Sequence, residues 1–209
     1  MGLFLTVLAC KTHSRDKVIR SVIEVMLERK YEIKEKKKVY EITGKENQFE
    51  ISNSKNDWIQ IFSPMIPDDK LVSELSKKLN VPVFQFHIHD GSFWMYQLFV
   101  SGNLMDRFNP IPQYWKKLTQ RERETWGGNA SLISSLFKIE KSKIQPYLVE
   151  WDSIRNKEIK IFQKDEFSLM NEWGMIDFQN KLGIIYPEFD KPQTLDLIRL
   201  SFKKKYKNA

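Results

Sequence analysis

The stretch from residue 83 to residue 108 decides the fold: VFQFHIH (83–89), DGS (90–92), FWMYQLFV (93–100), SGN (101–103) and LMDRF (104–108). In the first segment Phe84, Phe86 and Ile88 fall on one face of a strand, because side chains alternate across it. Asp90-Gly91 is a strong signal for a two-residue hairpin turn, and Ser101-Gly102-Asn103 indicates a second turn. The pattern therefore predicts a three-stranded antiparallel meander.

Strands and helices are expected to alternate upstream of this meander. The near-continuous apolar run Leu3–Ala9 is typical of a buried strand. Ser14 is a suitable N-cap for a helix whose apolar residues recur at helical spacing, and Asp68 is suitable for a second. The elements expected here are strands at 3–9, 39–43, 48–52 and 57–62, and helices at 14–30 and 68–80.

Downstream, Asn109-Pro110-Ile111-Pro112 predicts the end of the sheet region. Short helices should follow, including one capped by Asn129, and the chain should finish in an amphipathic helix over Thr194–Tyr206. The predicted class is α+β: a ferredoxin-like sandwich with an extended antiparallel meander, followed by a helical C-terminal part. We expect a sheet region at 1–109 and a helical region at 110–209 packed on it, as one domain overall.

Composition narrows the class of protein. The 209 residues are 41% hydrophobic and 13% aromatic, which is too apolar for a disordered chain. A single cysteine excludes an internal disulfide and favours a reducing compartment, so we expect a cytoplasmic protein. No apolar run approaches the ~20 residues needed to cross a bilayer, so no membrane span is expected.

Basic residues exceed acidic ones, 34 to 27, which gives a net charge of +7. Part of the excess lies in two runs, Lys34–Lys38 and Lys203–Lys207, which we interpret as solvated helix ends and tails. A basic surface is also compatible with an acidic partner. Nucleic-acid binding through the basic C-terminal helix is therefore kept as one alternative function.

A candidate polar site is formed by His87, His89 and Asp90. On a strand, the two histidines project from the same face about 7 Å apart, a spacing that lets both imidazoles reach one metal ion or phosphate. Zinc needs three or four ligands, and the sequence shows no second half-site. We expect the rings to be held by packing beside aromatic residues and predict no metal or other cofactor, with a metal- or phosphate-dependent enzyme as the alternative.

Signals for catalysis are weak elsewhere. Cys10 precedes a predicted helix N-terminus, where a thiol can be activated, and His13 lies close by in the sequence. A small buried hydrophobic residue is the favoured interpretation of Cys10. The sequence has no P-loop, no Gly-x-Ser-x-Gly elbow, no Cys-x-x-Cys pair and no His-Glu-x-x-His helix, which favours a non-enzymatic protein.

Aromatic residues provide a candidate interface at Trp94, Tyr96, Tyr114 and Trp115. Tryptophan and tyrosine are the residues most enriched among those that dominate binding energy in protein interfaces. They also fill cores, so most of them should be buried. Because Tyr114-Trp115 comes just after two prolines, we expect this pair to be partly exposed.

The order of elements in the middle third of the chain is similar to that of other proteins. An aromatic strand at Phe93–Phe99 is followed by Asp106–Pro110, Pro112–Trp115, a Gly127-Gly128-Asn129 helix start and Pro146-Tyr147-Leu148. In this order of elements the chain resembles uncharacterised small soluble bacterial proteins, and the resemblance implies a bacterial origin but no particular activity. Some proteins of this general build act as immunity or antitoxin proteins. The leading hypothesis is a non-enzymatic bacterial protein that binds another protein.

Overall fold

The computed structural model describes residues 2–63, 67–154, 158–187 and 195–205. Within these ranges the chain divides into two compact units. Unit 1 comprises residues 2–4, 86–98 and 104–186, and unit 2 comprises 5–85, 99–103 and 187–205. The units therefore do not follow the boundary expected at Asn109.

The described strands are antiparallel and follow the order β2-β8-β3-β4-β1-β5-β6-β7 in one open sheet. The mixture of helices with this sheet confirms the α+β class. The strands are β1 (Leu5–Lys11), β2 (Tyr31–Val39), β3 (Gln48–Ser52), β4 (Trp58–Ser63), β5 (Val83–His89), β6 (Phe93–Val100), β7 (Asn103–Phe108) and β8 (Leu197–Lys204). The helices are α1 (Arg15–Glu28), α2 (Asp69–Leu79), α3 (Gln120–Glu124), α4 (Ala130–Phe137) and α5 (Gly174–Lys181), and three 3-10 turns lie at Lys141–Lys143, Gln145–Tyr147 and Trp151–Ser153.

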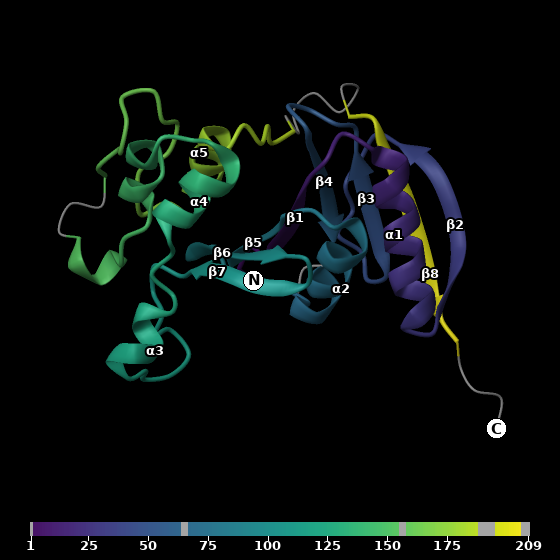
Figure 1. Ribbon diagram of the computed structural model, residues 1–209, viewed down its shortest axis with the longest axis horizontal. Helices are drawn as coiled ribbons and strands as arrows, with labels where there is room; N and C mark the ends of the chain where they lie inside the picture. Colours follow the sequence, from purple (N-terminus) through teal and green to yellow (C-terminus); the bar gives the residue numbers. More distant parts are fainter. Residues whose placement is uncertain (1, 64–66, 155–157, 188–194, 206–209) are drawn as a thin grey trace. The chain divides into compact units, whose positions relative to one another are not determined.

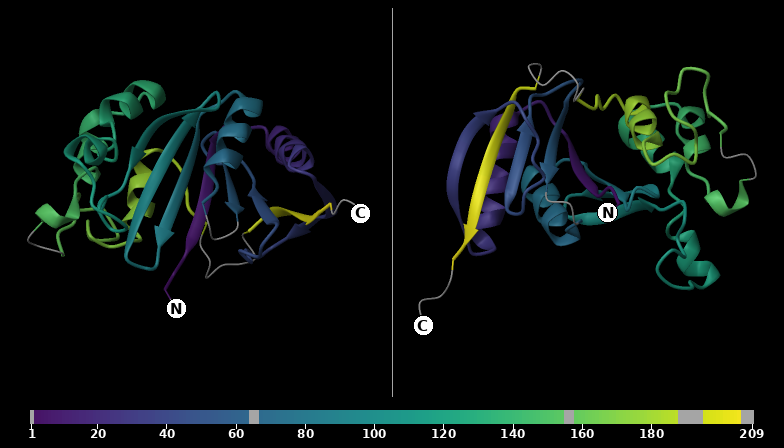
Figure 2. Two further views of the ribbon diagram at one scale, coloured as in Figure 1. Left: turned by 90° about the horizontal axis from the view of Figure 1, so that it is seen from below. Right: turned by 180° about the vertical axis from the view of Figure 1, so that it is seen from behind.

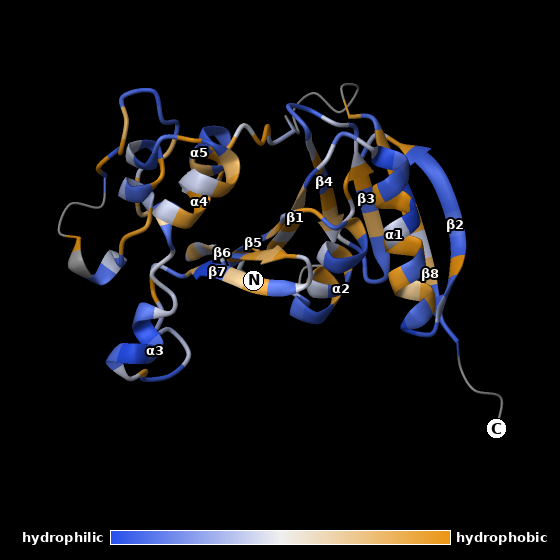
Figure 3. Ribbon diagram, viewed as in Figure 1, coloured by the Kyte–Doolittle hydropathy of each residue, from blue (hydrophilic) through white to orange (hydrophobic). Residues whose placement is uncertain are grey.

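In unit 2, helices α1 and α2 contact each other and lie over one face of the strands (Figures 1 and 2). Both N-caps are the predicted ones: Ser14 accepts from the Lys17 backbone N–H, and Asp68 accepts from that of Leu71. Apolar side chains of both helices and of strands β1, β3, β4 and β8 form one buried cluster. Figure 3 shows the hydrophobic colouring concentrated on β3, β4 and one side of α1.

The hairpin signals of the meander are confirmed. Strands β5, β6 and β7 start and end close to the predicted positions, with turns between them. Asp90 and Gly91 both have positive φ, 52° and 60°, as a type I′ turn requires. The Gly91 N–H donates to the Leu3 carbonyl at 2.8 Å, which ties the N-terminal segment to this turn.

The strand expected at Val39–Thr43 lies earlier in the chain. Strand β2 covers Tyr31–Val39 instead, so the run Lys34–Lys38 lies on a strand rather than at a helix end. Because β2 is the outermost strand and pairs only with β8, most of its side chains are exposed, and lysine there does not disturb a core. Figure 3 shows β2 largely hydrophilic.

The predicted C-terminal helix is wrong. Leu197–Lys204 forms strand β8, which lies between β2 and β3 and pairs antiparallel with both. Leu200 and Phe202 face the helices, whereas Arg199 faces the other side. The apolar residues of this segment fit the period of a helix as well as that of a strand. Pairing with a neighbouring strand on each edge determines that the segment forms a strand. Of the expected helix and basic run, residue 194 and residues 206–207 lie outside the described residues.

No helix in the described ranges is both long and apolar enough to cross a membrane.

Candidate functional site

The two histidines of the candidate polar site lie at the end of β5, in the part of the chain that belongs to unit 1. Their side chains point the same way, as predicted, and His87 Nε2 lies 3.4 Å from His89 Nδ1. His87 is buried, with 2% of its surface exposed, while His89 is half-buried. Of the two histidines, His89 is therefore the one that is accessible from the surface.

Aromatic rings surround His89 on several sides. Its ring centroid lies 5.1 Å from Phe4, 5.6 Å from Phe93, 5.4 Å from Tyr114 and 4.9 Å from Trp115. The contacts with Phe4, Tyr114 and Trp115 are edge-to-face, an arrangement that aromatic pairs favour. We call these residues, together with His87, the His89 cluster. The two candidate histidines thus lie together with Tyr114 and Trp115, two of the four candidate interface residues.

Tyr114 and Trp115 form the exposed surface of the His89 cluster, with 43% and 53% of each residue exposed. The connection that presents them is fixed by local hydrogen bonds: the Ile111 N–H donates to the Asn109 side chain at 2.8 Å, and the Tyr114 N–H donates to the Ile111 carbonyl at 3.0 Å. Phe93 is fully buried beneath both rings, 5.0 Å from Tyr114 and 5.7 Å from Trp115. The exposed aromatic pair therefore rests on a packed support, and the expectation of partial exposure is confirmed.

The His89 cluster shows no metal-site geometry. Across the described ranges, no group of three or more His, Cys, Asp or Glu side chains is arranged to hold a metal ion. Asp90 is exposed at the turn and lies against Gly2, where an added Cβ would meet the Asp90 carboxylate at 1.7 Å. Asp90 therefore contributes to the packing of the N-terminal segment.

Trp94 and Tyr96, the other two members of the candidate interface, lie in the interior. They are 1% and 0% exposed, because residues of β6 alternate and these two face the side opposite Phe93. The Tyr96 hydroxyl donates to Asp106 at 2.7 Å. Burial and the neighbouring Asp106 carboxylate raise the pKa of Tyr96 well above its usual value. Neither side chain can contact a partner in this fold, so both are removed from the candidate interface.

Cys10 is completely buried in the core of unit 2, and burial raises its pKa to about 12. A thiol with this pKa carries almost no thiolate near neutral pH, which argues against a nucleophile. The favoured interpretation of a small buried hydrophobic residue therefore agrees with its position.

Phe4 is the member of the cluster that sequence reasoning missed. It precedes β1 and lies over both histidines, with ring centroids 6.4 Å from His87 and 5.1 Å from His89. Its one sequence signal is its position within the apolar run Leu3–Ala9, which predicts a buried strand.

No protein family, no curated protein and no solved structure was found to match the chain. The resemblance of its middle third to small bacterial proteins stays a prediction.

Proposed function

We propose that this chain is a non-enzymatic bacterial protein that binds another protein through Tyr114 and Trp115. The observation that carries the proposal is that these two large aromatic side chains are about half exposed and yet rest on the buried Phe93 and on His89. A pre-positioned tryptophan or tyrosine loses little side-chain entropy on binding, so it can contribute strongly to affinity. A single buried cysteine is compatible with the bacterial cytoplasm, where we place the protein.

The charge beside the aromatic pair indicates the chemistry of the partner. Lys116 and Lys117 follow Trp115 directly, and both are exposed. A complementary surface would offer an apolar recess for Trp115, bordered by aspartate or glutamate side chains. An immunity- or antitoxin-type inhibitor, which binds one target protein, is one form of this function.

The two alternatives have less support. A metal- or phosphate-dependent enzyme would need more than His87 and His89, and no third ligand joins them among the described residues. Nucleic-acid binding was expected from a basic C-terminal helix, but this segment is strand β8, and Lys203 within it pairs with Glu32 at 2.7 Å. The ion pair reduces the free positive charge that such a function requires.

We also propose that β1, α1, β3, β4, α2 and β5 form a ferredoxin-like arrangement. The chain order β1-α1-β3-β4-α2-β5 combines with the sheet order β3-β4-β1-β5, the arrangement expected for a split βαβ pair. Strands β2 and β8 extend this sheet beyond β3.

Photo-crosslinking tests the proposed function. A benzophenone amino acid is placed at residue 117, next to the aromatic pair, or at residue 40, because Tyr40 is 52% exposed and belongs to unit 2. In lysates of the native cells, position 117 is expected to capture a protein that position 40 does not. The purified partner is then titrated by calorimetry against the wild type and the Trp115→Ala and Tyr40→Ala variants.

Trp115→Ala should weaken binding at least ~30-fold, which corresponds to the ~2 kcal/mol that defines a hot spot. Tyr40→Ala should leave the affinity unchanged. The proposal fails if the two positions capture the same proteins, or if the purified partner binds the Trp115→Ala variant as tightly as the wild type.

A further inference from the structure

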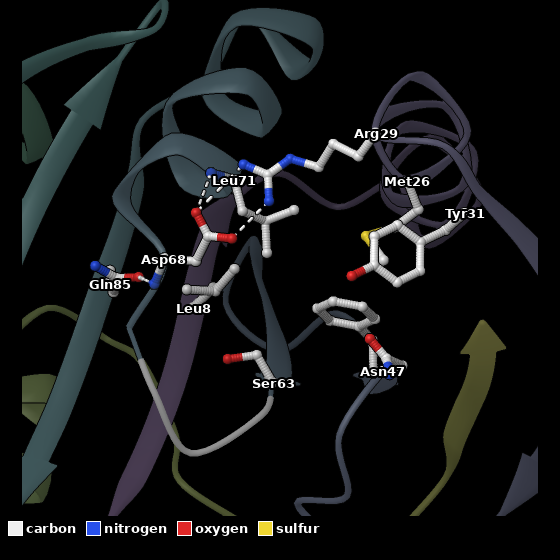
Figure 4. Close-up of a pocket in the computed structure, with 10 residues that line it drawn as sticks. Leu8, Met26, Arg29, Tyr31, Asn47, Ser63, Asp68, Leu71 and Gln85 are labelled. Atoms are coloured by element: carbon white, nitrogen blue, oxygen red, sulfur yellow. Dashed lines mark hydrogen bonds and ion pairs between the residues drawn. The ribbon is translucent and has the colours of Figure 1, made fainter. Parts of the chain in front are cut away.

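We propose that unit 2 binds a small monocarboxylic acid, with its apolar body in a cavity beneath α1 and α2 and its carboxylate beside Lys204. The cavity has a volume of about 120 Å³. Leu8, Leu71 and Tyr31 point toward a common space in it (Figure 4). A cavity of roughly 150 Å³ with apolar walls accepts benzene, so this smaller one fits a body of about five carbon atoms.

Apolar and polar side chains both line the cavity. Leu8, Met26, Phe49 and Leu71 supply its apolar walls. Arg29, Asp68, Ser63 and Gln85 line one part of it, the Arg29 end, and Tyr31 and Asn47 line another, the Tyr31 end, which continues into a neighbouring surface groove. Apolar walls combined with polar groups that fix the orientation of a ligand are the usual form of a small-molecule site.

The Arg29 end does not favour an anion. The Arg29 guanidinium donates to Asp68 at 2.5 Å (Figure 4). It also donates to Glu74 at 2.7 Å, so two carboxylates surround one positive charge. The Gln85 side chain is also engaged there: its oxygen accepts from the Asp68 N–H at 3.1 Å, and its nitrogen donates to Asp69 at 2.9 Å. A negatively charged ligand group is therefore directed toward the other end.

The Tyr31 end opens toward lysines. Tyr31 and Asn47 line both the cavity and a neighbouring surface groove, whose other lining residues include Lys203, Lys204 and Lys205. In the β2–β8 pairing, Tyr31 lies directly opposite Lys204, so both side chains project from the same face of the sheet. Glu32 lies opposite Lys203 and forms an ion pair with it on the other face.

Lys204 is thus the cation best placed to meet a carboxylate that leaves the cavity. Within the described ranges, Lys204 takes part in no ion pair, whereas Lys203 is paired. Glu46 also borders the groove, which lowers its net positive charge and favours a ligand with a single negative charge. The apolar walls favour a ligand with an apolar body, and Lys204 favours one with a negatively charged group.

Two probes of nearly equal shape test this site: hexanoate and its neutral counterpart hexan-1-ol. Each is titrated into the ¹⁵N-labelled full chain, and chemical-shift changes are followed at the backbone amides of Tyr31, Asn47 and Leu71. The acid should bind saturably with a dissociation constant of about 0.1 to 1 mM, as expected for a ligand of this size. The alcohol should bind about two- to five-fold more weakly, because it lacks the exposed ion pair.

Lys204→Gln should bring the affinity for the acid down to that for the alcohol, and added salt should do the same. Lys36→Gln, which removes an equally exposed lysine from β2, should change nothing. Leu71→Phe should fill the cavity and abolish binding of both probes, with thermal unfolding used to verify that the variant folds. The proposal is overturned if the acid shows no saturable binding to the wild type at concentrations up to about 10 mM. It is also overturned if the acid and the alcohol bind the wild type equally, a result that does not depend on how any variant folds.

Discussion

The Arg199 guanidinium on β8 lies 2.8 Å from the Glu50 carboxylate on β3, and the two side chains are only 8% and 0% exposed. The residues are direct cross-strand partners, and the Thr43 hydroxyl donates to the same Glu50 oxygen at 2.9 Å. The second Glu50 oxygen has no hydrogen-bond partner in the part of the chain that the structure describes. The charge of Glu50 is therefore compensated chiefly by one residue, which is distant in the sequence.

Removing either partner of this pair should be costly. We expect Glu50→Gln or Arg199→Met to lower the free energy of unfolding by about 3–5 kcal/mol. Arg199→Met leaves the Glu50 carboxylate buried without its counter-charge, and Glu50→Gln leaves Arg199 with only Glu41, whose side chain is 70% exposed. The double variant Glu50→Leu/Arg199→Met should cost much less than the sum of the two. Urea unfolding measures all three, and simple additivity would contradict the prediction. Lys203→Met, at an exposed pair, should change stability by less than about 1 kcal/mol.

Phe86 should be a major contributor to the stability of unit 1. Its fully buried ring lies 6.2 Å from Tyr96 and 6.3 Å from Phe178, between centroids. Phe86→Ala should lower the free energy of unfolding by about 3–5 kcal/mol through lost burial and the cavity left behind. Phe86→Leu keeps most of the volume and should cost clearly less. A loss below about 1 kcal/mol for the alanine variant would show that this face of β5 is not buried.

Cys10 should be unreactive in the folded protein. Burial raises the pKa of its thiol to about 12, so the thiolate that attacks disulfide reagents is scarce at pH values well below this. With Ellman's reagent near pH 8, we expect no reaction on the timescale of minutes and complete reaction of one thiol in guanidinium chloride. Fast labelling of the native protein would show that β1 opens readily. The Cys10→Ala variant verifies that the signal comes from this residue.

Asp68 should make stability depend on pH in the acid range. Burial favours a higher pKa for its carboxyl, but the hydrogen bonds from Arg29 and the Leu71 N–H, together with the Arg29 charge, outweigh it and lower the pKa. A lowered pKa in the folded state means that the stabilisation is present above the ordinary Asp value and is lost as the pH falls through the folded value.

The variant Asp68→Asn isolates this charge, because asparagine is an equally good N-cap. Between about pH 6 and pH 3, the wild type should lose about 0.5–1 kcal/mol more stability than the variant. The figure is small because 45% of the Asp68 side chain is exposed and solvent screens the ion pair. Identical pH profiles in denaturant titrations would show that the Arg29 pair adds nothing.

Features that depend on neighbouring residues were predictable from the sequence. The caps at Ser14, Asp68 and Asn129 and the Asp90-Gly91 turn each satisfy a local hydrogen bond or backbone requirement, and the structure confirms all of them. Strand alternation in β5 was also predictable. It shows which residues share a face but not which element covers that face. Phe84 and Phe86 share a face of β5, yet neither belongs to the buried cluster beneath α1 and α2.

Features that depend on distant segments were not predictable. Leu197–Lys204 is a strand because β2 and β3 bind its two edges, and both lie more than 140 residues earlier in the chain. The same holds for the candidate site. His89 and Trp115 each carried a local signal, but nothing in the sequence placed them in contact, or placed Phe4 over the histidines.

The insertion of β8 between β2 and β3 has a consequence for how the protein folds during synthesis. While the chain emerges from the ribosome, β2 at first has no partner strand, because its neighbour in the sheet, β8, begins more than 150 residues after β2 ends. Its lysine-rich sequence would keep this unpaired strand from associating with other nascent chains. Closure of the sheet must then wait until β8 has been made and has found its partners by a long-range search, which makes this a slow-folding topology.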